Sequence, residues 1–90
     1  MLKFETTTKF DRDVKRARKR RLDLSLMKAV IDTLVAEKPL EPKHHDHELS
    51  GEYTGLRECH VLSDWLLIYR ISEDGLTLVA TRTGTHSDLF

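Results

Sequence analysis

The stretch from Arg57 to Tyr69, which reads R-E-C-H-V-L-S-D-W-L-L-I-Y, constrains the fold more than any other part of the chain. Its second half, from Trp65 onward, is the longest uninterrupted apolar run, and ionisable residues stand directly before it. An apolar run of this length beside turn-forming residues is typical of a buried strand. We therefore predict two antiparallel strands, 53–62 and 65–71, joined by a two-residue turn at Ser63 and Asp64.

A third strand continues this sheet after a turn at residues 72–75. It covers residues 76–83, and Gly84 ends it, so that residues 87–90 form a short tail. In the strand at 53–62, alternation places Glu58 and His60 on one face and Cys59 and Val61 on the other. We therefore expect Cys59 to pack in the core if His60 faces a site.

The N-terminal half is predicted to form one strand and two helices. Apolar and polar residues alternate over residues 1–6, which indicates a short strand. Thr7 or Thr8 can cap a first helix, whose narrow apolar stripe recurs at helical spacing. A second helix runs from about Asp23 to Glu37, and Pro39 ends it. The link between the helices is short, which predicts an antiparallel helical hairpin.

These elements give the order β-α-α-β-β-β in a single domain, residues 1–90. The corresponding fold class is α+β, with the helical hairpin packed on one face of a mainly antiparallel sheet. A polar connection at residues 39–51 joins the two halves and shows no periodicity. It contains three of the five histidines, and its length indicates a functional role.

The charges of the chain cancel overall but are segregated along it. Between Lys9 and Arg21 stand eight basic residues and only two acids, so this segment carries +6. Such a block attracts polyanions, because neutralised phosphates release their counterions. The alternative is a solvated helix face. Within the block, we identify Lys15, Arg16 and Lys19 as candidate RNA contacts.

The number of cysteines and the length of the apolar runs bear on the cellular compartment of the protein. The single cysteine, Cys59, excludes an internal disulfide framework, which fits a reducing environment. The longest apolar run is five residues, far below the ~20 needed to cross a bilayer. The N-terminus has no signal-peptide pattern. We therefore expect a cytoplasmic protein that does not bind a membrane.

Chemically active side chains from separate segments are predicted to meet at one edge of the sheet. In an antiparallel meander, the first turn and the end of the third strand lie at the same edge. The residues brought together in this way are His60, Asp64, Trp65 and His86. Arg82 stands at the same end of the chain, and His47 joins the group if the long connection folds back.

This combination of side chains suits phosphodiester cleavage. Imidazoles are the usual general acids and bases near neutral pH, and a carboxylate can orient them. A guanidinium matches the geometry of a phosphate. Since RNA supplies its own nucleophile in the 2′-hydroxyl, an enzyme needs only a base, an acid and a cation. The pattern therefore predicts a ribonuclease without a cofactor.

A zinc site is the competing interpretation. His44, His45, Asp46 and His47 offer ligand atoms, and Cys59 and His60 could add others. The chain has no C-x-x-C pair, however, and its H-E at positions 47 and 48 does not continue to H-E-x-x-H. A nucleophilic pair of Cys59 with its neighbour is disfavoured, because adjacent strand residues face opposite sides.

The aromatic residues have two possible roles. Trp65 opens an apolar strand and either packs in the core or stacks on a base, whereas Tyr69 is expected in the core. Phe90 has little sheet left to pack on, and aromatic rings stack on splayed RNA bases. For Phe90, packing over the core and stacking on an RNA base are equal alternatives.

Three motifs closely resemble the YafQ family of bacterial type II toxins, within the RelE/ParE superfamily. They are D-H-E-L-S-G at 46–51, G-L-R-E-C-H-V-L-S-D-W-L-L-I-Y at 55–69 and R-T-G-T-H-S-D-L-F at 82–90. The resemblance covers essentially the whole chain, including the basic first helix. One departure is Ser63, which stands where relatives commonly have proline and loosens the turn. His44 and His45 match no family position.

The resemblance implies a ribosome-dependent endoribonuclease that cuts messenger RNA in the ribosomal A site, in contact with ribosomal RNA. It also implies neutralisation by a DinJ-like antitoxin with a ribbon-helix-helix DNA-binding domain, in a heterotetramer. By motif, the functional positions are His47, His60, Asp64, Arg82, His86 and Phe90. His86 is the expected general acid, and either Asp64 or His47 is the base.

A non-nuclease toxin is the alternative function. ParE-like members of the superfamily bind and poison DNA gyrase, and the basic helix would suit that role, although the histidines would then have no purpose. In either case, we expect an acidic segment of the antitoxin to cross residues 15–21 or to cover the site.

Overall fold

The alternating residues at the N-terminus form a short strand, β1 (Lys3–Thr6), at one edge of the sheet. The computed structural model describes residues 1–90 and places β1 parallel to the last strand, β5 (Thr77–Gly84). Thr7 then caps helix α1 (Thr8–Lys19), since its hydroxyl accepts a hydrogen bond from the Phe10 amide. The predicted strand and the predicted cap are both confirmed.

Both long helices end in a left-handed residue that is not glycine. After α1, Arg21 has φ = 61°, and the Leu22 amide donates back to the Ala17 carbonyl. Helix α2 (Leu24–Val35), capped by Asp23, ends in the same way at Glu37. This backbone pattern satisfies the last free carbonyls of each helix. It also ends α2 slightly before the predicted boundary, so the stop does not depend on Pro39.

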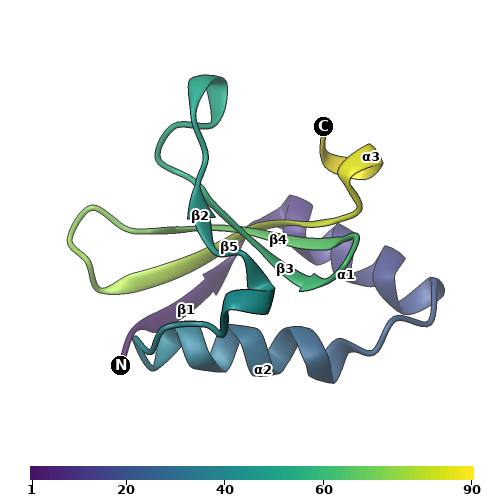
Figure 1. Ribbon diagram of the computed structural model, residues 1–90, viewed down its shortest axis with the longest axis horizontal. Helices are drawn as coiled ribbons and strands as arrows, with labels where there is room; N and C mark the ends of the chain where they lie inside the picture. Colours follow the sequence, from purple (N-terminus) through teal and green to yellow (C-terminus); the bar gives the residue numbers. More distant parts are fainter.

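The C-terminal half forms an antiparallel meander of β3 (Arg57–Leu62), β4 (Trp65–Ile71) and β5. The predicted strand at 53–62 is too long, because residues 51–53 belong to a short 3₁₀ helix, η2 (Gly51–Tyr53). The long connection also contains a strand that was not predicted, β2 (His47–Glu48), which pairs with β3. The sheet order is therefore β1-β5-β4-β3-β2 (Figure 1).

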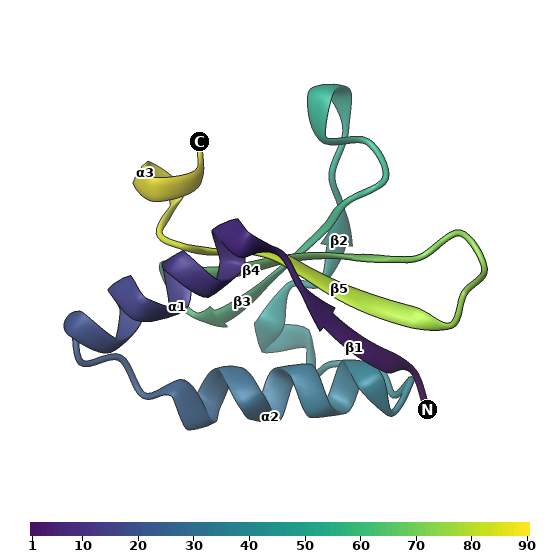
Figure 2. The same cartoon turned by 180° about the vertical axis from the view of Figure 1, so that it is seen from behind.

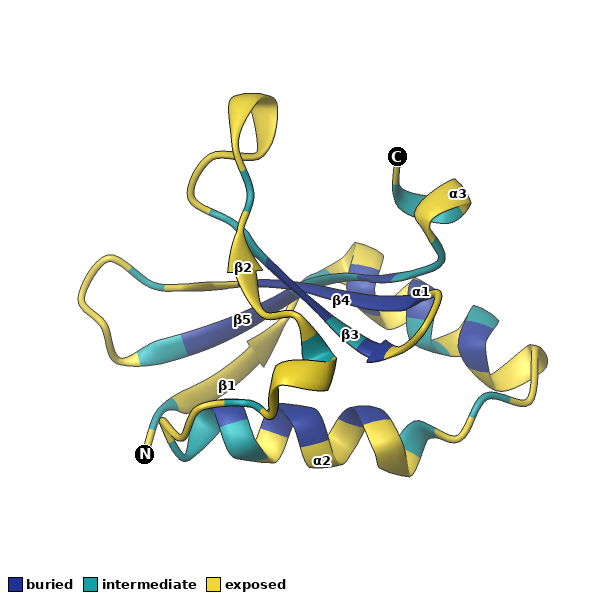
Figure 3. Ribbon diagram, viewed as in Figure 1, coloured by how far each residue is buried: buried dark blue, intermediate teal, exposed yellow.

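The two long helices pack on one face of this sheet, as predicted. They run in opposite directions and lie on the same side (Figure 2). Their inward side chains join those of the central strands in one core, in which β4 is the most deeply buried strand (Figure 3). Cys59, Val61 and Tyr69 are part of this core, in agreement with the predicted alternation.

Two short elements complete the end of the molecule where the predicted site lies. Most of the predicted tail, residues 87–90, belongs to the short helix α3 (His86–Leu89), which Thr85 caps through a reciprocal capping box with Asp88. The 3₁₀ helix η1 (Pro42–His44) lies in the long connection against β3. The longest helices have 12 residues, and none provides the apolar length that a bilayer crossing requires.

Candidate active site

Strand pairing aligns polar residues on the sheet face that points away from the two long helices. His47 pairs with Glu58, Glu58 pairs with Ile68, and Ile68 pairs with Arg82. Paired residues of adjacent strands point to the same side of a sheet. A register shift in β5 leaves Thr81 without a partner and brings Arg82 onto this face. The pairing therefore places two predicted site residues, His47 and Arg82, in one row with Glu58 and Ile68.

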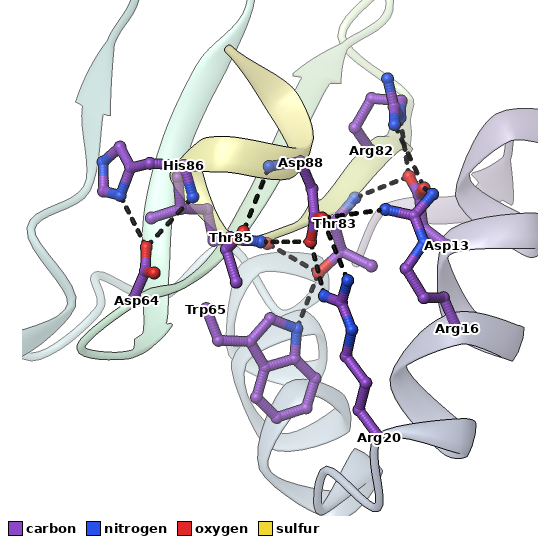
Figure 4. A network of polar contacts seen from close by, with 11 residues as sticks. Asp13, Arg16, Arg20, Asp64, Trp65, Arg82, Thr83, Thr85, His86 and Asp88 are labelled. Carbon is purple, nitrogen blue, oxygen red and sulfur yellow. Dashed lines mark hydrogen bonds and ion pairs between the residues drawn. The ribbon is translucent and has the colours of Figure 1, made fainter.

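His86 and Asp64 form a tight pair at the sheet edge (Figure 4). One carboxylate oxygen of Asp64 lies 2.8 Å from Nδ1 of His86 and accepts the His86 backbone N–H at 3.1 Å. These hydrogen bonds hold the pKa of Asp64 below its usual range. Because Nδ1 faces the carboxylate, Nε2 of His86 is the nitrogen left for a substrate. Asp64 is accordingly a weak proton acceptor.

A second histidine–carboxylate pair lies on the neighbouring strands. Oε1 of Glu58 is 3.3 Å from Nε2 of His47 and 3.8 Å from Nε2 of His60. The Glu58 side chain is only 7% exposed, whereas that of His47 is 50% exposed. Nδ1 of His47 lies 3.0 Å from the Glu48 carbonyl, which fixes the ring. The long connection therefore does fold back and brings His47 to the site.

Glu58 is the functional candidate that sequence reasoning missed. The alternation of β3 had placed it on the face of His60, and this was the available signal. A buried carboxylate is rare unless it has partners, and here the partners are two imidazoles. Glu58 therefore links His47 to His60 within the site.

Aromatic rings extend the site toward the C-terminus. The His60 and His86 rings lie 5.9 Å apart, and the His86 and Phe90 rings lie 6.3 Å apart. Phe90 also meets Tyr53 of η2 at 5.2 Å, in an edge-to-face arrangement. Phe90 remains 53% exposed. Its ring is thus held beside His86 while one face stays accessible.

Arg82 is held by a buried aspartate of α1. Asp13, one of the two acids within the basic segment 9–21, is only 3% exposed. It accepts hydrogen bonds from Arg82 Nε at 2.7 Å and from the Thr83 amide at 3.1 Å. This amide lies on the part of β5 that β1 no longer covers. The contact directs the guanidinium of Arg82 toward α1 and raises the pKa of this group (Figure 4).

The candidate RNA contacts of α1 separate into two groups. Lys15 and Lys19 are exposed, as predicted. Arg16 instead reaches Asp13 and Asp88, both at 3.3 Å, and its neighbour Arg20 binds Asp88 with two hydrogen bonds. Arg16 is therefore engaged within the protein, and it connects α1 to α3.

Trp65 does not offer its ring to a substrate, in contrast to the predicted base-stacking role. The side chain is 3% exposed, belongs to the core and donates its indole N–H to Thr83 Oγ1 at 2.9 Å. Strand alternation explains this placement, because Trp65 faces the helices together with Leu67 and Tyr69. Of the two roles considered, the core role is the one that fits.

Of the donors named by the zinc interpretation, only His60 belongs to the group that could hold a metal ion. Glu58, His60 and His86 each offer one ligand atom, and these atoms lie within 4.8 Å of one another. Imidazole and carboxylate ligands suit a divalent transition metal. Cys59 is completely buried on the opposite face, and burial raises the pKa of its thiol to about 12. Cys59 is therefore no ligand for this group.

A further network holds the strand that carries His47. The Tyr69 hydroxyl donates to Asp46 at 2.6 Å, and Arg57 lies 3.4 Å from the same carboxylate oxygen. Burial and the hydrogen bond to Asp46 raise the pKa of Tyr69. Asp46 directly precedes His47, so these contacts fix the start of β2.

Comparison with known proteins identifies the family. A sequence model described as "Bacterial toxin of type II toxin-antitoxin system, YafQ" matches residues 2–90. The chain belongs to the YafQ family of bacterial toxins. The mRNA interferase toxin YafQ of Escherichia coli K12 is 38% identical over 87 residues, which are 96% of this chain and 92% of the relative.

Solved structures of YafQ-like proteins share the complete fold. A metal-bound toxin from Helicobacter pylori superposes with a TM-score of 0.93 at 46% identity and covers 100% of both chains. The E. coli DinJ-YafQ toxin-antitoxin complex contains a chain with a TM-score of 0.89 at 37% identity, covering 99% of this chain and 97% of that one. The α+β fold predicted from the order of the elements is thereby confirmed.

Proposed function

We propose that this chain is the toxin of a type II toxin-antitoxin system and cuts messenger RNA in the A site of the ribosome. The observation that carries the proposal is the presence of two histidine–carboxylate pairs, His86 with Asp64 and His47 with Glu58, on either side of His60. Two such pairs can supply an acid and a base at once. The relative in E. coli is named an mRNA interferase, which supports the same conclusion.

In the proposed reaction, the RNA 2′-hydroxyl attacks the adjacent phosphorus. The His47–Glu58 pair accepts the proton of this hydroxyl, and Nε2 of His86 donates a proton to the departing 5′-oxygen. The products are a 2′,3′-cyclic phosphate and a 5′-hydroxyl. Asp64 orients His86 and stabilises its positively charged form, because its carboxylate faces Nδ1. We assign the base to His47, because Asp64 is held by His86. To take the proton, Nε2 of His47 leaves the Glu58 oxygen.

His60 and Arg82 stabilise the phosphorane. His60 lies between the two pairs and can direct an N–H donor toward a phosphate oxygen. Arg82 uses Nε and one terminal nitrogen for Asp13, so its other terminal nitrogen is the one left for phosphate. Phe90, beside His86, stacks on the base that follows the cut. No step in this scheme requires a cofactor.

The basic side of α1 contacts ribosomal RNA. Lys15 and Lys19 are exposed on a helix that is tied to α3 through Arg16 and Arg20, so their charge lies at the same end of the molecule as the site. Binding through phosphates is sequence-independent and weakens with salt. In this scheme the ribosome orients the message, and the histidine–carboxylate pairs carry out the cleavage.

A DinJ-like antitoxin is the proposed partner in a cytoplasmic heterotetramer, because the YafQ of E. coli occurs in a complex with DinJ. Its acidic segment crosses the exposed lysines of α1 or covers the site. A Lys15→Glu, Lys19→Glu variant should bind the antitoxin at least about tenfold more weakly, with Lys38→Glu as the control. Unchanged affinity would remove α1 from the interface, and native mass spectrometry gives the stoichiometry.

In vitro translation with and without the protein, followed by primer extension, tests the proposed activity. We expect discrete cuts in the message only when ribosomes are present. A 2′-deoxy substitution at the cut nucleotide should abolish the cut, because it removes the nucleophile. An intact message together with DNA damage in cells would instead support a gyrase poison.

A further inference from the structure

The segment around η1 carries basic side chains that the proposed reaction does not use. Residues 43–45, which are Lys43, His44 and His45, line one side of a hollow of about 500 Å³. Residues 60–63, which include His60 and the turn into β4, line the other side. Small-ligand sites have volumes in this range. The hollow therefore opens directly beside a residue of the proposed active site.

This segment is held in place against His60. Nδ1 of His44 donates to the His60 carbonyl at 2.6 Å, and the His45 ring meets the His60 ring edge-on at 5.4 Å. His45 adopts a left-handed backbone conformation with φ = 45°, which is uncommon for a residue with a side chain. The geometry thus presents the His45 ring at the mouth of the hollow.

We propose that this η1 hollow binds the RNA nucleotide on the 5′ side of the scissile phosphate, whose 2′-hydroxyl attacks. The proposal rests on the proposed function. The rings of His45, His60, His86 and Phe90 follow one another across the site, with neighbouring centroids 5.4, 5.9 and 6.3 Å apart. With His86 as the acid, the leaving nucleotide lies toward Phe90. The other nucleotide then lies toward His60 and the hollow.

The side chains of the hollow suit a nucleotide. The His45 ring can stack on a base, as aromatic side chains do on unpaired RNA. Lys43 is 71% exposed, and its ammonium group, which lies 3.7 Å from Glu41 in an exposed pair, can turn to a phosphate oxygen. Leu62 is 50% exposed and adds an apolar surface under the base. None of these three residues is needed to hold the core.

Steady-state cleavage of messages on programmed ribosomes, with the toxin limiting, tests this subsite. The messages carry either the normal nucleotide or an abasic ribonucleotide directly 5′ of the cut. For the wild type, we expect the abasic message to be cut with a kcat/KM lower by about 5- to 100-fold, since stacking on that base is lost. Asparagine tolerates the left-handed conformation of residue 45. The His45→Asn variant should therefore cut the normal message with a similarly reduced kcat/KM, and the abasic nucleotide should reduce its kcat/KM little further.

Lys43→Gln should raise KM on both messages without altering kcat, because the ammonium contacts a phosphate and not the base. Lys38→Gln, an exposed lysine outside the hollow, is the matched control and should behave as the wild type. If His45→Asn and the wild type responded equally to the abasic nucleotide, the subsite would be wrong. A wild type that cut no message at all would overturn the proposed function and the subsite with it.

Discussion

At the scale of single residues, replacing His86 and replacing His47, the histidines of the two histidine–carboxylate pairs, should affect cleavage differently. His86→Ala removes the acid and should lower the cleavage rate about 10²- to 10⁴-fold. A message with a 5′-phosphorothiolate linkage at the cut has a sulfur leaving group that needs no protonation, so it should restore much of this rate. His47→Ala should gain nothing from the same message. Equal rescue of both variants would contradict the assigned roles.

Asp13 is the residue whose loss should cost the most stability among the polar groups. Asp13→Asn keeps the size of the side chain but removes the charge that meets Arg82 Nε at 2.7 Å. Leaving that guanidinium without its buried partner should cost about 2 to 3 kcal/mol of unfolding free energy, measured by urea denaturation. Asp11→Asn, at an exposed position of the same helix, is the control and should change stability by less than about 1 kcal/mol.

At the scale of elements, α1 positions α3 and therefore His86. Arg20 binds Asp88 at 2.6 and 3.1 Å, and a side chain on Gly84 would come within 2.9 Å of Asp88. Asp88→Asn and Gly84→Ala should each displace α3 and lower kcat by roughly tenfold while KM changes little. Combining Arg20→Asp with Asp88→Arg should recover part of this rate, whereas a failure to recover any would argue against the contact.

The contact between Arg20 and Asp88 should weaken at low pH. The hydrogen bonds from Arg20 and Thr85 hold the pKa of Asp88 well below its ordinary value of 3.8. When the pKa of a carboxyl group is lower in the folded than in the unfolded protein, its ionised form stabilises the fold. This stabilisation is complete above the pKa of the unfolded protein and is lost as the pH falls through the pKa of the folded protein. We expect amide exchange in α3 to rise below about pH 4, and Asp88→Asn to show fast exchange at every pH.

At the scale of the whole molecule, the sequence predicted the features that depend on neighbouring residues. The cap at Thr7, the strand 65–71 and the two-residue turn before it each follow from local signals, and the structure confirms them. The meeting of His86 with Asp64 followed from the topology of a meander. The local signals were sufficient for the cap, the strand and the turn because each acts within one element or one hairpin, whereas the His86–Asp64 contact needed only the order of the strands.

The features that were missed depend on contacts between distant residues. Asp13 is 69 residues from Arg82, and nothing near Asp13 in the sequence distinguishes it from a surface acid. The strand β2 has only two residues and depends on its pairing with β3. The burial of Glu58 likewise became visible only when His47 and His60 were seen on both sides of it.

The parallel pairing of β1 with β5 has a kinetic consequence. The first strand pairs with residues 77–80, whereas the remaining strands join as local hairpins. Closing so long a loop costs entropy that local hairpins do not pay, and contacts of large sequence separation slow folding. The meander should therefore form first, and β1 should dock late, bringing α1 with it. Arg82 and α3 meet their α1 partners only at that step, so the catalytic end of the protein is completed last.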